Sequence, residues 1–328
     1  MSGSAALFAL LVSVGADQAV PAAPAAAPAP AAAADASDDG AESPSSSSKC
    51  TAPFKLEKKN KVLQTALERK IESEGWNKYI KQKTLAVAVV DLTRRGKRYF
   101  AGINDDNMMY SASLPKIAIL LAVVELVNNG EVEWTHEFDT KLTEMITASS
   151  NQDASWGVDI AGLANIEKTM RDPKYCLYDD TYGGLWIGRA YRSGGATKPS
   201  PTGDVSHGAT ARQAARFYTM LDAGQLVSKH WSFRMLGLMS PPKHFHKFVG
   251  GLSDRQGVVF LARKSGTWRN YHADSALIQH FGSRYVLVGL SETKDGEQIM
   301  RQLARDVDDI IMAGAHRKTT KKANTARR

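Results

Sequence analysis

The residues from 113 to 130 constrain the fold of this chain more than any other stretch. Residues 117–124 (IAILLAVV) are apolar without interruption, and a helix that is apolar on every side is a buried helix rather than an amphipathic one. Eight residues are too few to span a bilayer. Pro115 is tolerated only in the first turn of a helix, and Gly130 is a typical residue after a helix end. We therefore predict a buried helix that begins near Ser113 and ends near Asn128.

Ser113 and Lys116 stand at the start of this predicted helix. Their spacing of three residues places both side chains on one helical face, and the positive end of the helix dipole points at the serine. Partial burial lowers the pKa of a lysine, and the neutral amine can then take a proton from the serine hydroxyl. The same tetrad also fits an N-cap serine followed by a surface lysine, so the rest of the chain has to decide between the two interpretations.

The first 50 residues differ in composition from the middle of the chain. They are mostly Ala, Pro and Ser, which is too little large apolar surface to offset the entropy of ordering. Residues 5–14 are apolar, and the small residues Val14-Gly15-Ala16 follow, as in a secretory signal peptide, although no Lys or Arg precedes them. We therefore expect an exported protein, periplasmic or secreted. An Ala-rich disordered leader and a misassigned start codon are the alternatives.

The basic charge of the chain is concentrated at its C-terminal end. Residues 315–328 contain six Lys or Arg and no acid, so the formal net charge of +8 falls to +2, with 36 basic and 34 acidic residues, for the rest of the chain. This distribution does not indicate a nucleic-acid-binding domain. We expect a basic disordered tail at 315–328, no stable membrane span, and one substantial domain at residues 51–314.

Apolar periodicity predicts the order of the helices and strands in that domain. The sequence predicts a helix at 56–74, strands at 84–92 and 98–103, helices at 113–130, 138–148, 160–170, 209–221 and 229–239, strands at 258–264, 273–280 and 284–290, and a closing amphipathic helix at 297–311. Residues 172–208 form a long irregular loop in this prediction. The order indicates an α+β fold with a five-stranded antiparallel sheet. The N- and C-terminal helices cover one face of the sheet, and an abridged all-helical subdomain covers the other.

Two more polar motifs stand at the ends of predicted elements. Ser149 and Asn151 follow a predicted helix and would place a hydroxyl and a carboxamide side by side. Lys264-Ser265-Gly266 closes a predicted strand with a cation, a hydroxyl and a residue without a side chain. The glycine lets a substrate lie against the strand, and the cation can pair with a substrate carboxylate. Taken singly, each motif also fits ordinary turn residues.

Taken together, in this order and on these elements, the three motifs resemble the Ser-x-x-Lys, Ser-Asp-Asn and Lys-Thr-Gly signature of class A β-lactamases and penicillin-binding proteins. The resemblance covers about residues 55–312. It implies a serine hydrolase that opens β-lactam amides through an acyl-enzyme and needs no cofactor. Two alternatives remain open. One is a D-Ala-D-Ala peptidase, amidase or esterase with the same acylation chemistry, and the other is a protein that binds penicillin or a peptidoglycan peptide without turnover.

The resemblance also implies which residues carry out the chemistry. Ser113 matches the acylated nucleophile, Lys116 matches the base that activates it, and Ser149 matches the relay that passes a proton to the leaving nitrogen. The backbone N–H groups of Ser113 and Thr267 match the oxyanion hole, in which two fixed donors stabilise the charge that develops during attack.

Four residues match the part of the family's site that binds the substrate. Asn151 matches the ligand of the substrate's side-chain amide. Lys264 and Ser265, beside Gly266, match the pair that binds the substrate carboxylate. No metal site is expected, because the eight histidines and two cysteines include no cluster with ligand spacing.

The sequence departs from the family's pattern in three places. Ser150 replaces the middle aspartate of Ser-Asp-Asn, and only 36 residues separate Ser113 from Ser149. A Glu-x-x-Leu-Asn segment, whose glutamate activates the deacylating water in the family, does not follow Ser149. Asp179 and Asp180 are candidates for that role, but local hydrogen bonds that hold the loop are the more ordinary function for either.

Cys50 and Cys176 are the two cysteines of the chain. An exported protein could join them in a disulfide. The sequence does not show that they lie close together, and two unpaired thiols fit it at least as well.

Overall fold

The structure is a computed structural model of the 328-residue chain. It describes residues 50–325 except 55 and 57, and it describes side chains as far as residue 314. The predicted signal-like leader and nearly all of the Ala/Pro/Ser-rich segment therefore lie outside the described residues.

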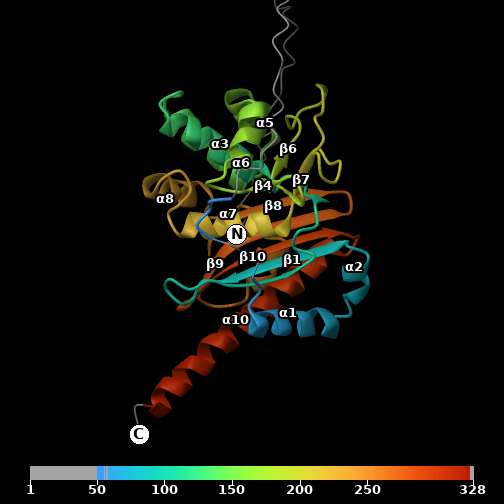
Figure 1. Ribbon diagram of the computed structural model, residues 1–328, viewed down its shortest axis with the longest axis vertical. Coiled ribbons are helices and arrows are strands. Elements are labelled where there is room, and N and C mark those ends of the chain that lie inside the picture. The colour runs from blue at the N-terminus through green and yellow to red at the C-terminus, as the bar shows by residue number, and fades with distance from the viewer. Residues whose placement is uncertain (1–49, 55, 57, 326–328) are drawn as a thin grey trace, which may run out of the picture. The chain divides into compact units, whose positions relative to one another are not determined.

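A five-stranded antiparallel sheet lies at the centre of the described chain (Figure 1). Its strands, in spatial order, are β2 (Tyr99–Ile103), β1 (Leu85–Asp91), β10 (Ser283–Glu292), β9 (Tyr271–His280) and β8 (Val258–Trp268). β1 is buried at every position except its last, and a strand that is covered on both faces is apolar throughout rather than alternating. Because β1 pairs with β10, segments far apart in the sequence meet in the middle of the sheet, and β8 is left at an edge.

Helices from both ends of the domain cover one face of the sheet (Figure 1). They are α1 (Lys61–Ser73) and α10 (Gly296–Thr325), with the short helices α2 (Asn77–Lys81) and α9 (Lys247–Leu252). The buried residues of α1, Leu63, Leu67 and Ile71, are spaced four apart and form one apolar stripe. They share a core with Leu303 and Val307 of α10 and with side chains of the sheet.

A block of helices covers the opposite face. Its members are α3 (Lys116–Asn128), α4 (His136–Thr147), α5 (Asn151–Ala161), α6 (Leu163–Arg171), α7 (Ala211–Asp222) and α8 (Lys229–Leu238). α7 packs directly on the sheet, and α3 packs against α4, α5 and α6. α3 is buried from Lys116 to Leu126, as its apolar sequence predicts. The predicted α+β fold, with its five-stranded sheet between the terminal helices and a helical subdomain, is therefore confirmed.

The long loop predicted at residues 172–208 runs beside the segment that precedes Ser113. It contains the short strands β4 (Tyr178–Asp179), β5 (Gly183–Gly184) and β6 (Trp186–Ile187) and the start of β7 (His207–Ala209), and β7 pairs with β3 (Met109–Tyr110). The backbone N–H of Ser111 donates to the His207 carbonyl at 2.9 Å. A disulfide joins Cys50 to Cys176. The sequence alone was equally consistent with two unpaired thiols.

Several boundaries differ from those predicted. α3 begins at Lys116 rather than near Ser113, because the preceding residues form a turn in which the Leu114 N–H donates to the Ser111 carbonyl. The helices α2, α5 and α9 were not predicted. α9 has six residues, too few for periodicity to show. α10 runs to Thr325, past residue 314, where the sequence predicts a disordered tail; Ala, Lys and Arg in that segment are good helix formers.

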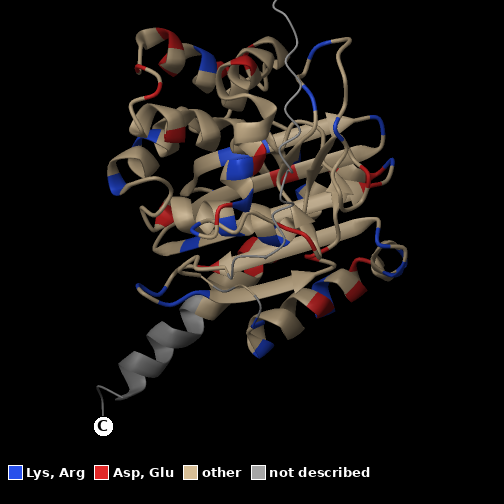
Figure 2. Ribbon diagram, turned by 45° about the horizontal axis from the view of Figure 1, so that its top comes forward, with Lys and Arg blue, Asp and Glu red and all other residues tan. Residues whose placement is uncertain are grey.

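Charged residues of both signs are interspersed over the described elements (Figure 2). This mixture agrees with the small net charge that the sequence leaves once residues 315–328 are set aside. Among the helices that the structure describes, none has both the length and the apolar character needed to cross a membrane.

Candidate active site

Ser149 lies between two buried lysines from different parts of the chain. Its hydroxyl accepts a hydrogen bond from Lys264 Nζ at 2.8 Å, and its carbonyl accepts one from Lys116 Nζ at 2.7 Å. Lys116 Nζ also donates to Asn151 Oδ1 at 2.8 Å and to the Ser150 carbonyl at 3.1 Å. The start of α3, the connection from α4 to α5 and strand β8 therefore meet at one place, and each contributes one of the three motifs found in the sequence.

Strand β8 also passes directly beside the turn that carries Ser113. A Cβ atom added to Gly266 would lie 2.2 Å from the Ser111 carbonyl oxygen and 2.7 Å from the Ser113 backbone nitrogen. No other residue type fits there without movement, so the glycine is what allows the strand to approach the turn. Ser113 itself is half-buried, and Thr267 follows Gly266 on the same edge strand.

The backbone on both sides of this cluster has unusual conformations. Ala112, which precedes Ser113, has φ of 52°, and Ser149 has φ of 60°. Residues with a side chain pay about 1–3 kcal/mol for the left-handed region, and such residues persist where the surroundings hold them. The Tyr191 hydroxyl donates to the Ala112 carbonyl at 3.0 Å, which is one of the contacts that fix the turn before Ser113.

Burial changes the acid–base properties of both lysines. It lowers the pKa of Lys116 to about 7, against the opposing effect of the Asp153 carboxylate. The Tyr191 ring lies 4.5 Å from Lys116 Nζ and is part of this low-dielectric surrounding. Burial also holds the pKa of Lys264 well below its usual range, and the positive charge of Lys116 adds to that effect. At neutral pH a large fraction of Lys116 is therefore an uncharged amine, which is the form that can accept a proton.

The remaining residues of the two later motifs lie in the same cluster. Lys264 Nζ donates to the Ser265 carbonyl at 2.6 Å, and Ser265 is buried. Asn151 Oδ1 is bound by Lys116, so the NH₂ group of this amide is left as its donor. Ser150, where the family has an aspartate, caps α5 instead, because its hydroxyl accepts from the Asp153 N–H at 3.2 Å.

Sequence comparison agrees with this geometry. The model of the family described as the Beta-lactamase enzyme family (Beta-lactamase2) matches residues 66–147 and 139–311. The chain belongs to this β-lactamase enzyme family. A comparison with curated proteins found no match.

Solved structures of two β-lactamases and of PBP-A share the fold at low sequence identity. A β-lactamase from Sphaerobacter thermophilus is 16% identical, with a TM-score of 0.57, over 76% of this chain and 95% of that one. A class A β-lactamase from Bacteroides cellulosilyticus is 15% identical, with a TM-score of 0.59, over 76% and 99%. A mutant of PBP-A, solved as an acyl-enzyme complex with penicillin G, is 18% identical, with a TM-score of 0.57, over 77% and 97%.

Asp179 and Asp180, the candidates for activating the deacylating water, bind within the loop and to the helices beside it. Asp179 Oδ1 accepts from the N–H groups of Thr181 and Tyr182, and Asp179 Oδ2 accepts from Gln213 on α7. Asp180 pairs with Arg171 at the end of α6. These contacts correspond to the loop-holding role, and the role in deacylation stays a prediction.

Sequence reasoning did not find three residues of this β-lactamase-family site. Tyr191 contacts Lys116, and its ring packs against the His207 ring at an interplanar angle of 42°, with centroids 4.3 Å apart. His207 is buried, which lowers its pKa to about 4, and its Nε2 lies 3.1 Å from the Arg189 carbonyl. Lys247 lies behind β8. Tyr191 and His207 belong to an irregular loop, where no periodicity marks a contact, and Lys247 begins a helix that is too short to predict.

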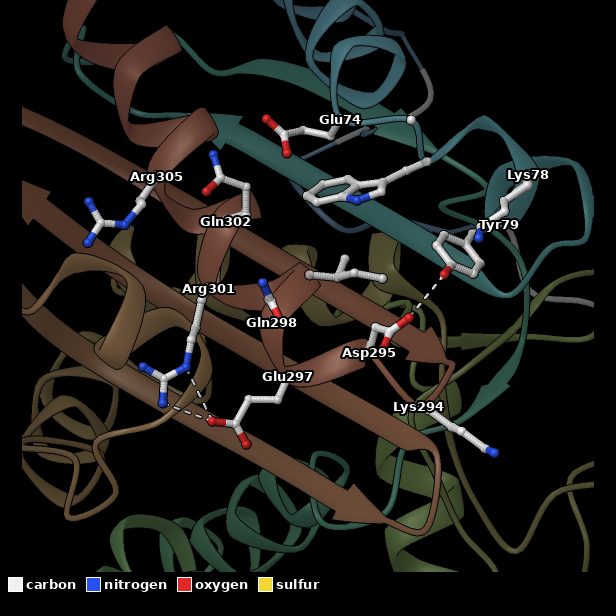
Figure 3. A pocket seen from close by; sticks show the side chains of 13 residues that line it. Glu74, Lys78, Tyr79, Lys294, Asp295, Glu297, Gln298, Arg301, Gln302 and Arg305 are labelled. Carbon is white, nitrogen blue, oxygen red and sulfur yellow. Dashed lines mark hydrogen bonds and ion pairs between the residues drawn. The ribbon is translucent and has the colours of Figure 1, made fainter.

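An open cavity of about 870 Å³ lies away from this cluster, between the α1–α2 connection and the start of α10. Figure 3 shows two interactions among the side chains that line it: Arg301 contacts Glu297, and the Tyr79 hydroxyl contacts Asp295. It lies on the face of the sheet that α1 and α10 cover, and none of the three motifs lines it.

Proposed function

We propose that this protein is a serine hydrolase of the class A β-lactamase type that opens β-lactam amides through an acyl-enzyme on Ser113. The observation that carries the proposal is the position of Ser149, hydrogen-bonded to both Lys116 and Lys264 beside the turn of Ser113. Acyl transfer needs a nucleophile, a base and a proton donor for the leaving group within one small volume. The hydrogen bonds of Ser149 to both lysines and the approach of Gly266 to the Ser113 backbone support such an arrangement.

The chemistry follows from the state of Lys116. As an uncharged amine, Lys116 has two N–H groups and one lone pair. It can then donate to only two of its three oxygen acceptors, and the lone pair can accept the proton of the Ser113 hydroxyl. Ser113 Oγ then attacks the lactam carbonyl carbon while its proton passes to Lys116. The carbonyl–nitrogen bond breaks, the leaving nitrogen takes a proton from the Ser149 hydroxyl, and Ser149 regains one from Lys116.

The proposed substrate carries a carboxylate and an amide side chain. Lys264 is a buried amine, and the next residue on the strand, Ser265, carries a hydroxyl. A carboxylate placed there would offset the cost of the two buried lysines. The free NH₂ of Asn151 would donate to the carbonyl of the substrate's amide.

The state of Asp179 and Asp180 favours a second candidate function. Both carboxylates have their recorded partners in the loop and its neighbouring helices, and the family's Glu-x-x-Leu-Asn segment is missing from the sequence. Without a base for the deacylating water, the acyl-enzyme would persist. The protein would then act as a penicillin-binding protein, or as a D-Ala-D-Ala peptidase that β-lactams inhibit.

A chromogenic cephalosporin and intact-mass spectrometry distinguish these candidates. We expect a covalent adduct on Ser113, with steady hydrolysis if the protein is a β-lactamase and a persistent adduct if it is penicillin-binding. Ser113→Ala should abolish the adduct and lower any hydrolysis by roughly 10³-fold or more. Ser111→Ala is the matched control, since that hydroxyl is buried and has no partner among the described residues. Neither adduct nor hydrolysis with correctly folded protein would reject both candidates.

We further propose that the protein is exported. The apolar stretch at residues 5–14 is typical of a signal peptide, and the Cys50–Cys176 disulfide fits an oxidising compartment. Fractionation of expressing cells, with the N-terminus of the mature protein read by mass spectrometry, tests this proposal.

A further inference from the structure

We propose that Lys247 is a positioning residue that orients and polarises the Gly266–Thr267 peptide, so that the Thr267 N–H serves as a donor to the oxyanion formed at Ser113. The inference rests on the proposed acylation of Ser113. It adds a function for a buried lysine that lies outside all three sequence motifs.

The first observation is the set of hydrogen bonds that the Lys247 ammonium group donates. The side chain is fully buried at the start of α9, and its Nζ donates to the Gly266 carbonyl at 2.5 Å, to Thr267 Oγ1 at 2.8 Å and to the Ala273 carbonyl at 3.0 Å. All three donors of the ammonium therefore go to oxygen atoms of the β8–β9 pair. Lys247 itself has φ of 52°, so the chain accepts a strained backbone where it presents this side chain.

The second observation is the direction of the Thr267 N–H, which belongs to the same peptide group as the Gly266 carbonyl. Gly266 and Ala273 are partners in the β8–β9 ladder, and both carbonyls reach one Nζ, so the Gly266 carbonyl points toward β9. In a trans peptide the C=O and the following N–H point in opposite directions. The Thr267 N–H is therefore directed out of the free edge of β8, since β8 is the edge strand.

This free edge lies beside the nucleophile. The backbone nitrogen of Ser113 would be 2.7 Å from a Cβ on Gly266, so the two backbone donors, from Ser113 and Thr267, lie at the same junction of β8 and the turn before α3. Two fixed N–H groups near the attacked carbonyl are what an oxyanion hole requires. The orientation of one of them depends on the peptide that Lys247 holds.

The charge of Lys247 also strengthens that donor. A hydrogen bond from an ammonium to a carbonyl is charge-assisted, and hydrogen bonds in series polarise one another where the dielectric is low. The polarised peptide presents a more positive N–H to a developing oxyanion. Six charged or titratable groups interact electrostatically with Lys247. They are Arg263 and Lys264 on β8, His272 and Asp274 on β9, Glu297 on α10, and His246, the residue before α9.

The protonation of Lys247 gives the inference a measurable signature. Burial lowers the pKa of Lys247 to about 8, with the Asp274 carboxylate acting in the opposite direction. As the pH rises through about 8 the ammonium loses its proton and the polarisation is lost, whereas Lys116 becomes the active base as the pH rises through about 7. The rate of acylation should therefore pass through a maximum between these two values and then fall on the alkaline side.

The direct test observes the Thr267 amide itself. Gly266-Thr267 is the only Gly-Thr dipeptide in the sequence, so labelling with carbonyl-¹³C glycine and ¹⁵N threonine selects this single amide in an NMR spectrum. We expect its shift to change with an inflection near pH 8 in the wild type. The inflection should be absent in Lys247→Met, and in Lys247→Arg below pH 10, because a guanidinium keeps its proton. A wild-type amide that shows no inflection between pH 6 and 10 overturns the proposal.

The kinetic test uses benzylpenicillin and intact mass over the same pH range. Lys247→Met should acylate on the order of tenfold more slowly at pH 7, a smaller loss than the removal of an oxyanion donor, and should lack the alkaline fall. Lys247→Arg should recover part of the rate and move the fall upward. Lys97→Met, an exposed lysine, is the control and should behave as wild type. A wild-type pH profile in Lys247→Met contradicts the proposal.

The two tests separate this proposal from the function on which it rests. An amide inflection near pH 8 without any adduct would reject the proposed acylation and leave the polarisation by Lys247 in place. An adduct without the inflection would reject the role of Lys247 and leave acylation in place. Circular dichroism checks folding, and if Lys247→Met does not fold, the wild-type inflection and Lys247→Arg decide.

Discussion

At the scale of single residues, the site depends on removing lysines from water. Lys116 and Lys264 come from a helix and a strand and lie on either side of Ser149. Each is buried, and the positive charge of Lys116 adds to the effect of burial in lowering the pKa of Lys264. An exposed lysine keeps its proton far above neutral pH, so burial is what makes a base available. The three oxygen acceptors of Lys116 fix its position in the site.

The pH dependence of acylation tests this account of Lys116. The base is the neutral amine, whose fraction falls about tenfold per pH unit below its pKa of about 7. The acylation rate should therefore drop about tenfold between pH 6 and pH 5 and approach its maximum only above pH 7. Intact-mass time courses with benzylpenicillin provide the measurement. A rate that stays constant from pH 5 to pH 7 would show that Lys116 is not the base.

At the scale of elements, the site depends on how closely β8 approaches the turn before α3. Gly266 makes this approach, since the space that a Cβ would take is already filled by Ser111 and Ser113 backbone atoms. The turn is held from the other side by Tyr191 and by the pairing of β3 with β7. The distance between nucleophile and strand is thus set by backbone packing rather than by flexible side chains.

Gly266→Ala should separate these two elements. The added methyl group must displace backbone, and overpacking of this kind costs about 1–3 kcal/mol of unfolding free energy. Acylation should fall by roughly 10²-fold, because one oxyanion donor moves out of place. Denaturant unfolding and intact mass measure the two effects. Gly282→Ala is the matched control, since a Cβ there meets nothing within 4 Å, and equal behaviour of the two variants would refute the argument.

The sequence predicted elements well where they are long and apolar, and poorly where they are short. The five sheet strands and α3 were found from apolar runs and from the turn and helix-end residues that flank them. α5 was missed although Ser150 and Asp153 mark a helix start with a serine cap and an acid three residues later. α9 has no such signal. As a result Lys247, which begins α9, could not be connected with β8 before the fold was known.

At the scale of the whole molecule, the Cys50–Cys176 disulfide links the first described residue to the loop of residues 172–208. The bridge closes a loop with a sequence separation of 126 residues, which includes β1, β2 and most of the helical block. Closing a long loop restricts the unfolded chain more than the folded one. The bridge therefore belongs to the stability of the domain rather than to the chemistry at Ser113.

Removing the disulfide should destabilise the fold. The double variant Cys50→Ser with Cys176→Ser should lose roughly 2–5 kcal/mol of unfolding free energy, measured by denaturant unfolding. Adding a reductant to the wild type should produce a similar loss and should leave the double variant unchanged. If wild type and double variant unfold at the same denaturant concentration, the bridge does not stabilise the domain.

The fold class, the β-lactamase family signature and the three motifs could all be recognised in the amino-acid sequence. They could be recognised there because apolar periodicity and short motifs are local properties of the chain. Which side chains lie together in the site became visible in the folded chain. Ser149 lies between two lysines, β8 touches the turn of Ser113, Tyr191 covers Lys116, and Lys247 holds Gly266 from behind. These contacts join residues far apart in the chain. The distances between the groups and the pKa values of the lysines depend on packing and burial, which a local sequence pattern does not show.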